Sequence, residues 1–169
     1  MQRISGPSAP GLVRAFLTIH SAPSALRQHI DWALANILGS ELQVKWQSQP
    51  MMVGTYKMHI QWRGQQGAAA EIASTLRSWH YLNFEVHESN DNGGELFRFT
   101  PELGIHRVLT DLSGAVLLNE HQINNVVQHC VDEDAIRDGL ALAMGNAWDE
   151  ALEKFRGAGM QEVARLHAI

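Results

Sequence analysis

The sequence predicts an α+β fold, a ferredoxin-like βαββαβ antiparallel sheet sandwich with additional strands and C-terminal helices. Apolar and polar residues alternate in four segments before residue 90, with the period of a half-buried strand. Two segments between them repeat their apolar residues with the period of a helix. Right-handed crossovers in this order place both helices on one face of a four-stranded sheet.

The first strand is predicted at residues 12–20, and it leads directly into a helix predicted at about 22–38. Pro23 suits the first turn of this helix, and Gly39 suits the position after its last residue. Ser21 then occupies the place of a helix N-cap. The face of the strand that we expect to point into the core carries Val13, Ala15, Leu17 and Ile19.

The second and third strands, at 41–48 and 55–62, are predicted to form a hairpin with a long tip, because Pro50 and Gly54 lie between them. A second helix follows the break at 64–67 and leads to a fourth strand. The residues expected to point inward are Leu42, Val44, Trp46, Tyr56, Met58, Ile60 and Trp62, then Ala69, Ile72, Ala73, Leu76 and Trp79 of the helix, and Leu82, Phe84 and Val86 of the fourth strand.

The part of the chain after the loop at 91–94 is predicted to add strands and then helices. The strands either extend the sheet or form a second small one. Asn119 is expected to cap a first helix, and Asp132 a longer one from about 133 to 156 that ends at two glycines. The strand-like runs lie at about 95–100, 105–110 and 115–118, and the two glycines are Gly157 and Gly159.

The longer C-terminal helix carries two apolar stripes, more than one contact face usually needs. We therefore expect this helix to pack both on the domain and on a partner. The second of its stripes consists of Met144, Trp148, Leu152 and Phe155.

We expect one domain at residues 11–169, preceded by a disordered leader at residues 1–10. Within the domain, residues 11–90 form the βαββαβ core, and residues 91–169 supply the extra strands and the C-terminal helices. The leader lacks the apolar core of a signal peptide, and no segment approaches the roughly 18 apolar residues that span a bilayer.

The composition indicates a soluble cytoplasmic protein. Of the 169 residues, 45% are hydrophobic and 18% are charged, and a single cysteine, Cys130, excludes an intramolecular disulfide. The formal net charge of −5 gives no general attraction to phosphate backbones or anionic lipids. We therefore expect neither nucleic acid nor a membrane as a partner.

A candidate anion site lies at His20 and Ser21, where the first strand is expected to meet the first helix. The free N–H groups of a helix N-terminus could bind a phosphate or carboxylate there, as on coenzyme A or a nucleotide. The alternative is structural, because Ser21 is a good N-cap without any ligand. No glycine-rich phosphate loop accompanies this junction.

A second candidate is the sheet face that the two predicted helices leave uncovered. If the first strand lies between the third and the fourth, Phe16 shares this face with His59 and Glu85. These residues could orient a ligand or a partner; alternatively, the face is solvated or covered by the C-terminal helices. RNA-binding sheets of this topology use the same face, but the third strand lacks the basic and aromatic pattern of their RNP motif.

No catalytic or metal-binding motif is present in recognisable spacing. The nine histidines do not follow metal-ligand spacing, and Cys130 has no second cysteine to pair with. Cys130 continues an apolar helix stripe beside His129, as a core thiol does, and no G-x-S-x-G motif occurs. We therefore expect no metal, no cofactor and no enzyme activity.

A series of short motifs runs in order along nearly the whole chain after residue 10. The motifs are His20-Ser21-Ala22-Pro23, Trp46 with Gln49-Pro50, Trp62-Arg63-Gly64, Leu82-Asn83-Phe84-Glu85-Val86, Thr100-Pro101-Glu102-Leu103-Gly104-Ile105 and Ala147-Trp148-Asp149-Glu150. In these motifs the chain resembles an actinobacterial family, domain of unknown function thirty-one forty-five. The loop at 91–94 and the last dozen residues depart from the family pattern.

The resemblance implies a cytoplasmic actinobacterial protein from a family that tends to be encoded close to fatty-acid synthesis genes. With the surplus apolar helix surface, it favours a non-catalytic regulatory or accessory protein that binds a large enzyme of fatty-acid synthesis, either acyl-CoA carboxylase or the fatty-acid synthase machinery. The expected contact residues are Phe16, His59 and Glu85 on the sheet and Met144, Trp148, Leu152 and Phe155 on the helix. The alternative is a coenzyme A or nucleotide-binding protein or enzyme, with its anion at His20 and Ser21.

Overall fold

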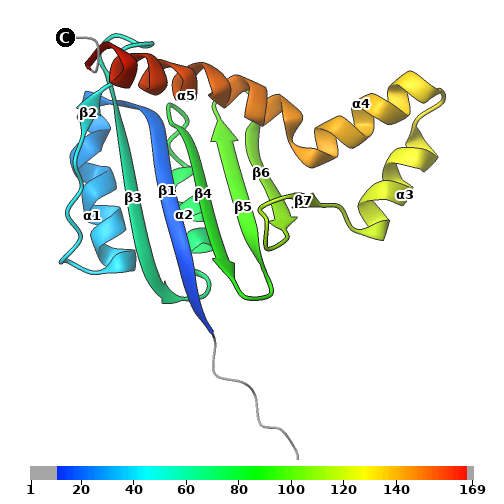
Figure 1. Ribbon diagram of the computed structural model, residues 1–169, viewed down its shortest axis with the longest axis horizontal. Helices are drawn as coiled ribbons and strands as arrows, with labels where there is room; N and C mark the ends of the chain where they lie inside the picture. Colours follow the sequence, from blue (N-terminus) through cyan, green and yellow to red (C-terminus); the bar gives the residue numbers. More distant parts are fainter. Residues whose placement is uncertain (1–10, 167–169) are drawn as a thin grey trace, which may run out of the picture.

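The sheet orders its strands β2-β3-β1-β4-β5-β6-β7, and each strand is antiparallel to its neighbours (Figure 1). The computed structural model describes residues 11–166, with side chains up to residue 157. The strands are β1 (Leu12–Pro23), β2 (Gln47–Ser48), β3 (Thr55–Gln65), β4 (Asn83–Asn90), β5 (Gly93–Thr100), β6 (Gly104–Thr110) and β7 (Val116–Leu117). The helices are η1 (Ser24–Leu26, a 3-10 turn), α1 (Arg27–Leu38), α2 (Ala68–Leu76), α3 (Glu120–His129), α4 (Glu133–Met144) and α5 (Asn146–Leu166).

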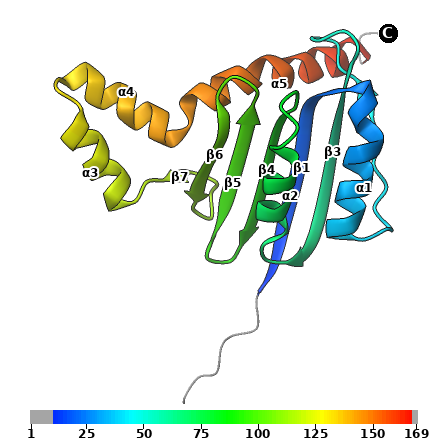
Figure 2. The same ribbon diagram turned by 180° about the vertical axis from the view of Figure 1, so that it is seen from behind.

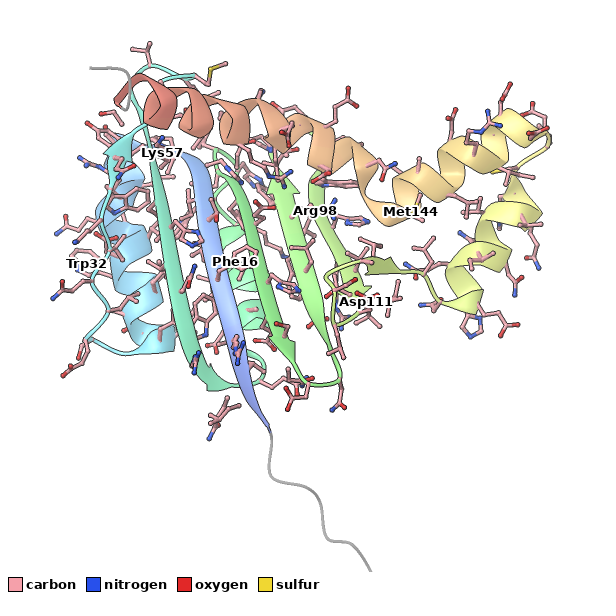
Figure 3. All side chains as sticks on the ribbon, in the orientation of Figure 1. Phe16, Trp32, Lys57, Arg98, Asp111 and Met144 are labelled. Atoms are coloured by element: carbon pink, nitrogen blue, oxygen red, sulfur yellow. The ribbon has the colours of Figure 1, made fainter. Side chains whose placement is uncertain are left out.

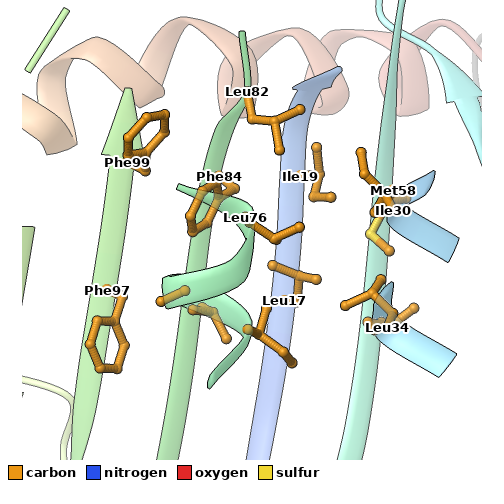
Figure 4. Packing of buried hydrophobic residues seen from close by; sticks show 14 of the residues in the cluster. Leu17, Ile19, Ile30, Leu34, Met58, Leu76, Leu82, Phe84, Phe97 and Phe99 are labelled. Atoms are coloured by element: carbon orange, nitrogen blue, oxygen red, sulfur yellow. The ribbon is translucent and has the colours of Figure 1, made fainter. Parts of the chain in front are cut away.

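Helices α1 and α2 cover one face of the sheet, and Figure 2 shows this face. The main core lies between these helices and the strands, where Leu17 of β1 packs with Leu34 of α1 and Leu76 of α2 (Figure 4). Phe84 and Phe99 stack across β4 and β5 with ring centroids 5.3 Å apart. Each large apolar side chain buried in this way stabilises the fold by about 1.5–3 kcal/mol relative to exposure.

The predicted α+β class is confirmed, and so are most of the predicted inward positions. All of them except Tyr56 are buried or pack against the core, because alternation along each strand keeps one side toward the helices. Tyr56 instead lies beneath Arg27, whose guanidinium carbon is 3.8 Å from the ring centroid. The first strand lies between the third and the fourth, as expected. The later strand-like runs extend the same sheet, and Asn119 and Asp132 cap their helices as predicted.

The predicted helix start at Ser21 is wrong, because the first strand continues through Pro23. The pairing of β1 with both neighbours shifts after Ile19, so the strand bends at a bulge without ending there. Ser21 is fully buried, and its Oγ donates to Met52 Sδ at 3.3 Å. The helix begins only after η1, and its N-cap is Leu26.

The predicted helix at 133–156 is two helices, because the chain turns at Gly145. This glycine has φ +83°, in the left-handed region that ends α4. A Cβ atom there would lie 2.5 Å from His106 Cε1 and 2.9 Å from Arg98 Nη1, so the position has no room for a side chain. Helix α5 then continues to Leu166, past the two glycines that were expected to end it.

The predicted strand at 41–48 is regular only at β2, although Leu42, Val44 and Trp46 still pack against the core. Its pairing with β3 confirms the predicted hairpin. Residues 1–10, predicted as a leader, lie outside the described residues.

Candidate functional site

Helix α5 covers part of the sheet face opposite α1 and α2, near the ends of the strands (Figure 1). Trp148, Leu152 and Phe155 are buried there, with exposed fractions of 8%, 0% and 3%. The Trp148 ring stacks on His106 at 4.5 Å between centroids, and Phe155 stacks on His20 at 6.0 Å. These three members of the second apolar stripe therefore contact the chain's own sheet.

Glu85 is the centre of a charged network beneath α5. Its Oε1 accepts a hydrogen bond from His20 Nε2 at 3.0 Å, and its Oε2 accepts one from Arg156 Nη2 at 2.7 Å. Arg156 also pairs with Asp149 and Glu153 of its own helix. Burial acts to raise the pKa of Glu85, but the hydrogen bonds and charges of His20 and Arg156 outweigh it and lower the pKa to about 2. A carboxylate with this pKa is a poor proton donor or acceptor near neutrality, and Glu85 serves to anchor α5.

The junction of α4 and α5 is held from the sheet by Arg98 and His106. Arg98 Nη1 donates to the Gly145 carbonyl oxygen at 2.7 Å, and His106 Nε2 donates to the Ala143 carbonyl oxygen at 3.0 Å. Burial lowers the pKa of His106, and the nearby charge of Arg98 acts in the same direction. The imidazole is therefore neutral at neutral pH, and the two side chains fix the direction in which α4 leaves the sheet.

A groove of about 530 Å³ lies where α5 approaches β1, β3 and the β2 hairpin. Its lining includes the residues of the Glu85 network and Phe155 of α5. The basic and imidazole side chains that line it are His20, Lys45, Lys57, His59 and Arg156. The groove connects the covered part of this sheet face with its uncovered part.

Phe16 is the central aromatic residue of the uncovered part of this face (Figure 3). Its ring lies between two imidazoles, with centroid distances of 6.0 Å to His59 and 5.5 Å to His87. His59 Nδ1 lies 2.8 Å from Thr18 Oγ1, and Gln61 Nε2 lies 3.1 Å from His59 Nε2. The amide nitrogen of Gln61 can only donate, so His59 Nε2 accepts, Nδ1 carries the proton and donates to the Thr18 hydroxyl, and the ring is held at both nitrogens.

Arg14 of β1 and Arg63 of β3 lie directly opposite each other. Arg14 is two residues before Phe16 along β1, so it points to the same face of the sheet. Both side chains are exposed. Within the described residues, neither guanidinium forms a hydrogen bond or ion pair. The positions that follow Arg14 across the sheet are Ser89, Gly94 and Thr110, so this row carries positive charge and no carboxylate.

Helices α3 and α4 and the short segment between them, which we call the helical arm, project beyond the β7 edge of the sheet (Figures 1 and 2). Both helices are described throughout, and neither contains a buried residue. They approach each other closely at Gly139, where a Cβ atom would lie 2.7 Å from Val126 Cγ1. Other apolar side chains are exposed, among them Val127 at 52%, Val131 at 96% and Leu142 at 55%. The charged residues of the arm are Glu120, Asp132, Glu133, Asp134, Asp138 and Arg137.

The structure brings His20, His59 and Glu85 together at the groove, and it leaves Met144 half-buried at the end of the arm. The anion hypothesis at Ser21 loses its geometric basis, because no helix starts there and the hydroxyl is buried. Sequence reasoning missed Arg98 and the pairing of Arg14 with Arg63 beside Phe16. Alternation placed Arg14 on the same face as Phe16, but the pairing of two arginines becomes visible only with the register.

Within residues 11–166 no cluster of histidine, cysteine, aspartate and glutamate side chains has the arrangement of a metal site. Cys130 is half-buried against the α3–α4 contact. None of the described helices has the length and apolar character needed to cross a membrane.

These features define a class of protein: a small α+β domain with a charged groove, a basic and aromatic sheet face, and a projecting acidic helical arm. The chain belongs to the family described as a protein of unknown function, DUF3145, whose match covers residues 16–168. This match confirms the family resemblance indicated by the sequence motifs. No curated protein and no solved structure matches the chain.

Proposed function

We propose that this protein is a non-catalytic regulatory or accessory protein of the cytoplasm that binds a large enzyme of fatty-acid synthesis, acyl-CoA carboxylase or the fatty-acid synthase machinery. We further propose that residues 11–90 form a ferredoxin-like unit. The strand order β2-β3-β1-β4, with α1 and α2 on one face, supports this topology.

The helical arm is the observation that carries the proposal. A helix in a soluble domain normally buries one apolar face, and the arm buries none of its residues fully. Its exposed side chains Val127, Val131 and Leu142 therefore offer apolar area to a partner. Trp148, Leu152 and Phe155 of the second stripe are used within the chain, so we propose that the arm makes the partner contact that this stripe was expected to make.

The charge of the arm indicates the chemistry of the partner surface. Five carboxylates and one guanidinium lie on it, so it holds most of the formal net charge of −5. Complementary potentials steer association and select partners. We propose that the arm docks on an apolar surface of the enzyme that is rimmed by lysine or arginine.

The test is an affinity purification of the tagged full-length chain from its native cytoplasm, followed by mass spectrometry. We expect a carboxylase or synthase subunit in near-stoichiometric amount, and we expect Val127→Glu to reduce its recovery about tenfold or more. The matched control is Val53→Glu, because Val53 is 98% exposed at the β2–β3 tip, far from the arm in sequence. Recovery of neither subunit, or equal recovery by Val127→Glu and wild type, contradicts the proposal.

A further inference from the structure

The uncovered sheet face combines an aromatic platform with paired positive charges, and neither feature is needed by the fold. Like charges directly opposite each other on neighbouring strands destabilise a sheet. Arg14 and Arg63 have this arrangement, without a compensating hydrogen bond or ion pair in the described residues. An anion placed between the two guanidinium groups would remove the repulsion and accept hydrogen bonds from the N–H groups of both.

The neighbouring row supplies a surface on which a planar ring can stack. Phe16 lies two residues from Arg14 along β1, a spacing of about 7 Å in a strand. His59 and His87 lie on either side of its ring, and hydrogen bonds hold both imidazoles. His87 reaches across β5 to Thr110 Oγ1 because the intervening residue, Gly94, has no side chain to block it. The platform is therefore preorganised in the free protein.

We propose that this face binds a nucleotide, with the base stacked on Phe16 and a phosphate bound between Arg14 and Arg63. Stacking on the accessible part of an aromatic ring accepts any base, whereas paired guanidinium groups select phosphate or carboxylate. The ligand class therefore joins a planar ring to an anion. The site is separate from the helical arm and does not depend on the protein partner proposed above.

The binding experiment uses the full-length chain and three probes: N-methylanthraniloyl-ADP, coenzyme A and a single-stranded eight-residue RNA. Fluorescence anisotropy and calorimetry give each dissociation constant for the wild type and for Arg14→Gln, Arg63→Gln and Phe16→Ala. We expect at least one probe to bind, with affinity about tenfold weaker in each arginine variant and about fivefold weaker in Phe16→Ala. Arg77→Gln is the matched control, because Arg77 is an exposed arginine at the end of α2, and we expect it to bind within about twofold of wild type.

The three probes separate the sources of the same chemistry. Binding of N-methylanthraniloyl-ADP or coenzyme A identifies a small nucleotide as the ligand. Binding of the RNA alone identifies a nucleic acid. Either result supports the proposed site. The proposal is overturned if all three probes fail to bind at millimolar concentration. It is also overturned if the arginine and Phe16 variants bind like the control. Because Arg63→Gln removes one of two like charges, we expect its melting temperature to be at least that of the wild type. A loss of probe binding in this variant therefore reports the loss of the site and not unfolding.

Discussion

Glu85 is the residue on which the attachment of α5 to the sheet most depends. Its carboxylate accepts hydrogen bonds from His20 of β1 and from Arg156 of α5. It therefore links the sheet to the helix. Its pKa of about 2 lies below the ordinary value of 4.5, so the folded state favours the ionised form. The corresponding stability is fully present above pH 4.5 and is lost as the pH falls toward 2.

We predict that Glu85→Gln removes this acid dependence and lowers the free energy of unfolding at pH 7. The shift in pKa corresponds to at most about 3 kcal/mol. Urea unfolding of both proteins at several pH values from 7 to about 3 measures it. Glu133→Gln is the control, because Glu133 pairs with Arg137 on the exposed surface of α4 and contributes only about 0.5 kcal/mol. Equal acid dependence in wild type and Glu85→Gln would show that the carboxylate has no special role.

Glu88 performs a different structural task at the start of α2. The helix has no side-chain cap of its own, and Glu88 on β4 accepts hydrogen bonds from Gly67 N at 2.8 Å and Ala69 N at 3.1 Å. A helix N-terminus attracts an anion, and here the chain supplies one from its own sheet. This end of α2 is therefore not a ligand site.

We predict that Glu88→Gln destabilises the protein by about 1–2 kcal/mol, because the amide group turns one of the two acceptors into a donor and removes the charge. Glu88 is only 3% exposed, so solvent cannot replace the lost bond. Thermal unfolding followed by circular dichroism measures the change. The exposed Glu102→Gln should remain within about 0.5 kcal/mol of wild type, and a similar loss in both variants would contradict the capping role.

At the scale of whole elements, the turn between α4 and α5 determines which part of the sheet is covered. Gly145 combines a left-handed backbone with a close approach to His106 and Arg98. We predict that Gly145→Ala destabilises the protein by about 2 kcal/mol or more, since both the backbone and the contacts oppose a Cβ atom. Gly157→Ala in α5 meets no atom within 4 Å and should stabilise by about 0.5–1 kcal/mol. Denaturant unfolding compares the two; loss in both would mean that α5 tolerates no added methyl group.

The same turn shows how far sequence patterns extend. Periodicity predicted the longer strands, α2 and the capped starts of α3 and α4, because these depend on local alternation and local hydrogen bonds. It did not predict the break at Gly145, since the bond from Arg98 that fixes it joins residues 47 positions apart. Ser21 was assigned to a helix for a similar reason. Its local preference is for an N-cap, but pairing with β4 keeps it in a bulged strand.

The candidate site also combines features that local sequence patterns predict with features that depend on contacts distant in the sequence. Alternation together with the predicted strand order placed Phe16, His59 and Glu85 on one face, because the side-chain period of a strand is two residues. The sequence left open which rows of that face the C-terminal helices cover. The answer depends on the path of α5 after Gly145, which buries Phe155 over His20 and leaves Phe16 uncovered.

At the scale of the whole molecule, charge and packing divide the chain into two parts. The sheet and its three covering helices hold the buried residues, whereas the helical arm holds exposed apolar side chains and most of the net negative charge. The arm is attached through the α4–α5 junction, where Arg98 and His106 bind consecutive parts of the turn. Its two helices therefore have little burial to oppose local opening.

We predict that backbone amides of α3 and α4 exchange with deuterium about tenfold faster or more than those in the middle of β1 and β3 in the free protein. Exchange through local opening reports how much burial holds each segment, and the arm has none of its residues fully buried. Hydrogen exchange with mass spectrometry at pH 7 measures both segments in one experiment. Addition of the purified carboxylase or synthase subunit should slow exchange in the arm and leave β1 and β3 unchanged, because docking there buries Val127 and Val131. Slow exchange of the arm in the free protein would mean that it is stable by itself, and its exposed side chains would then no longer require a partner.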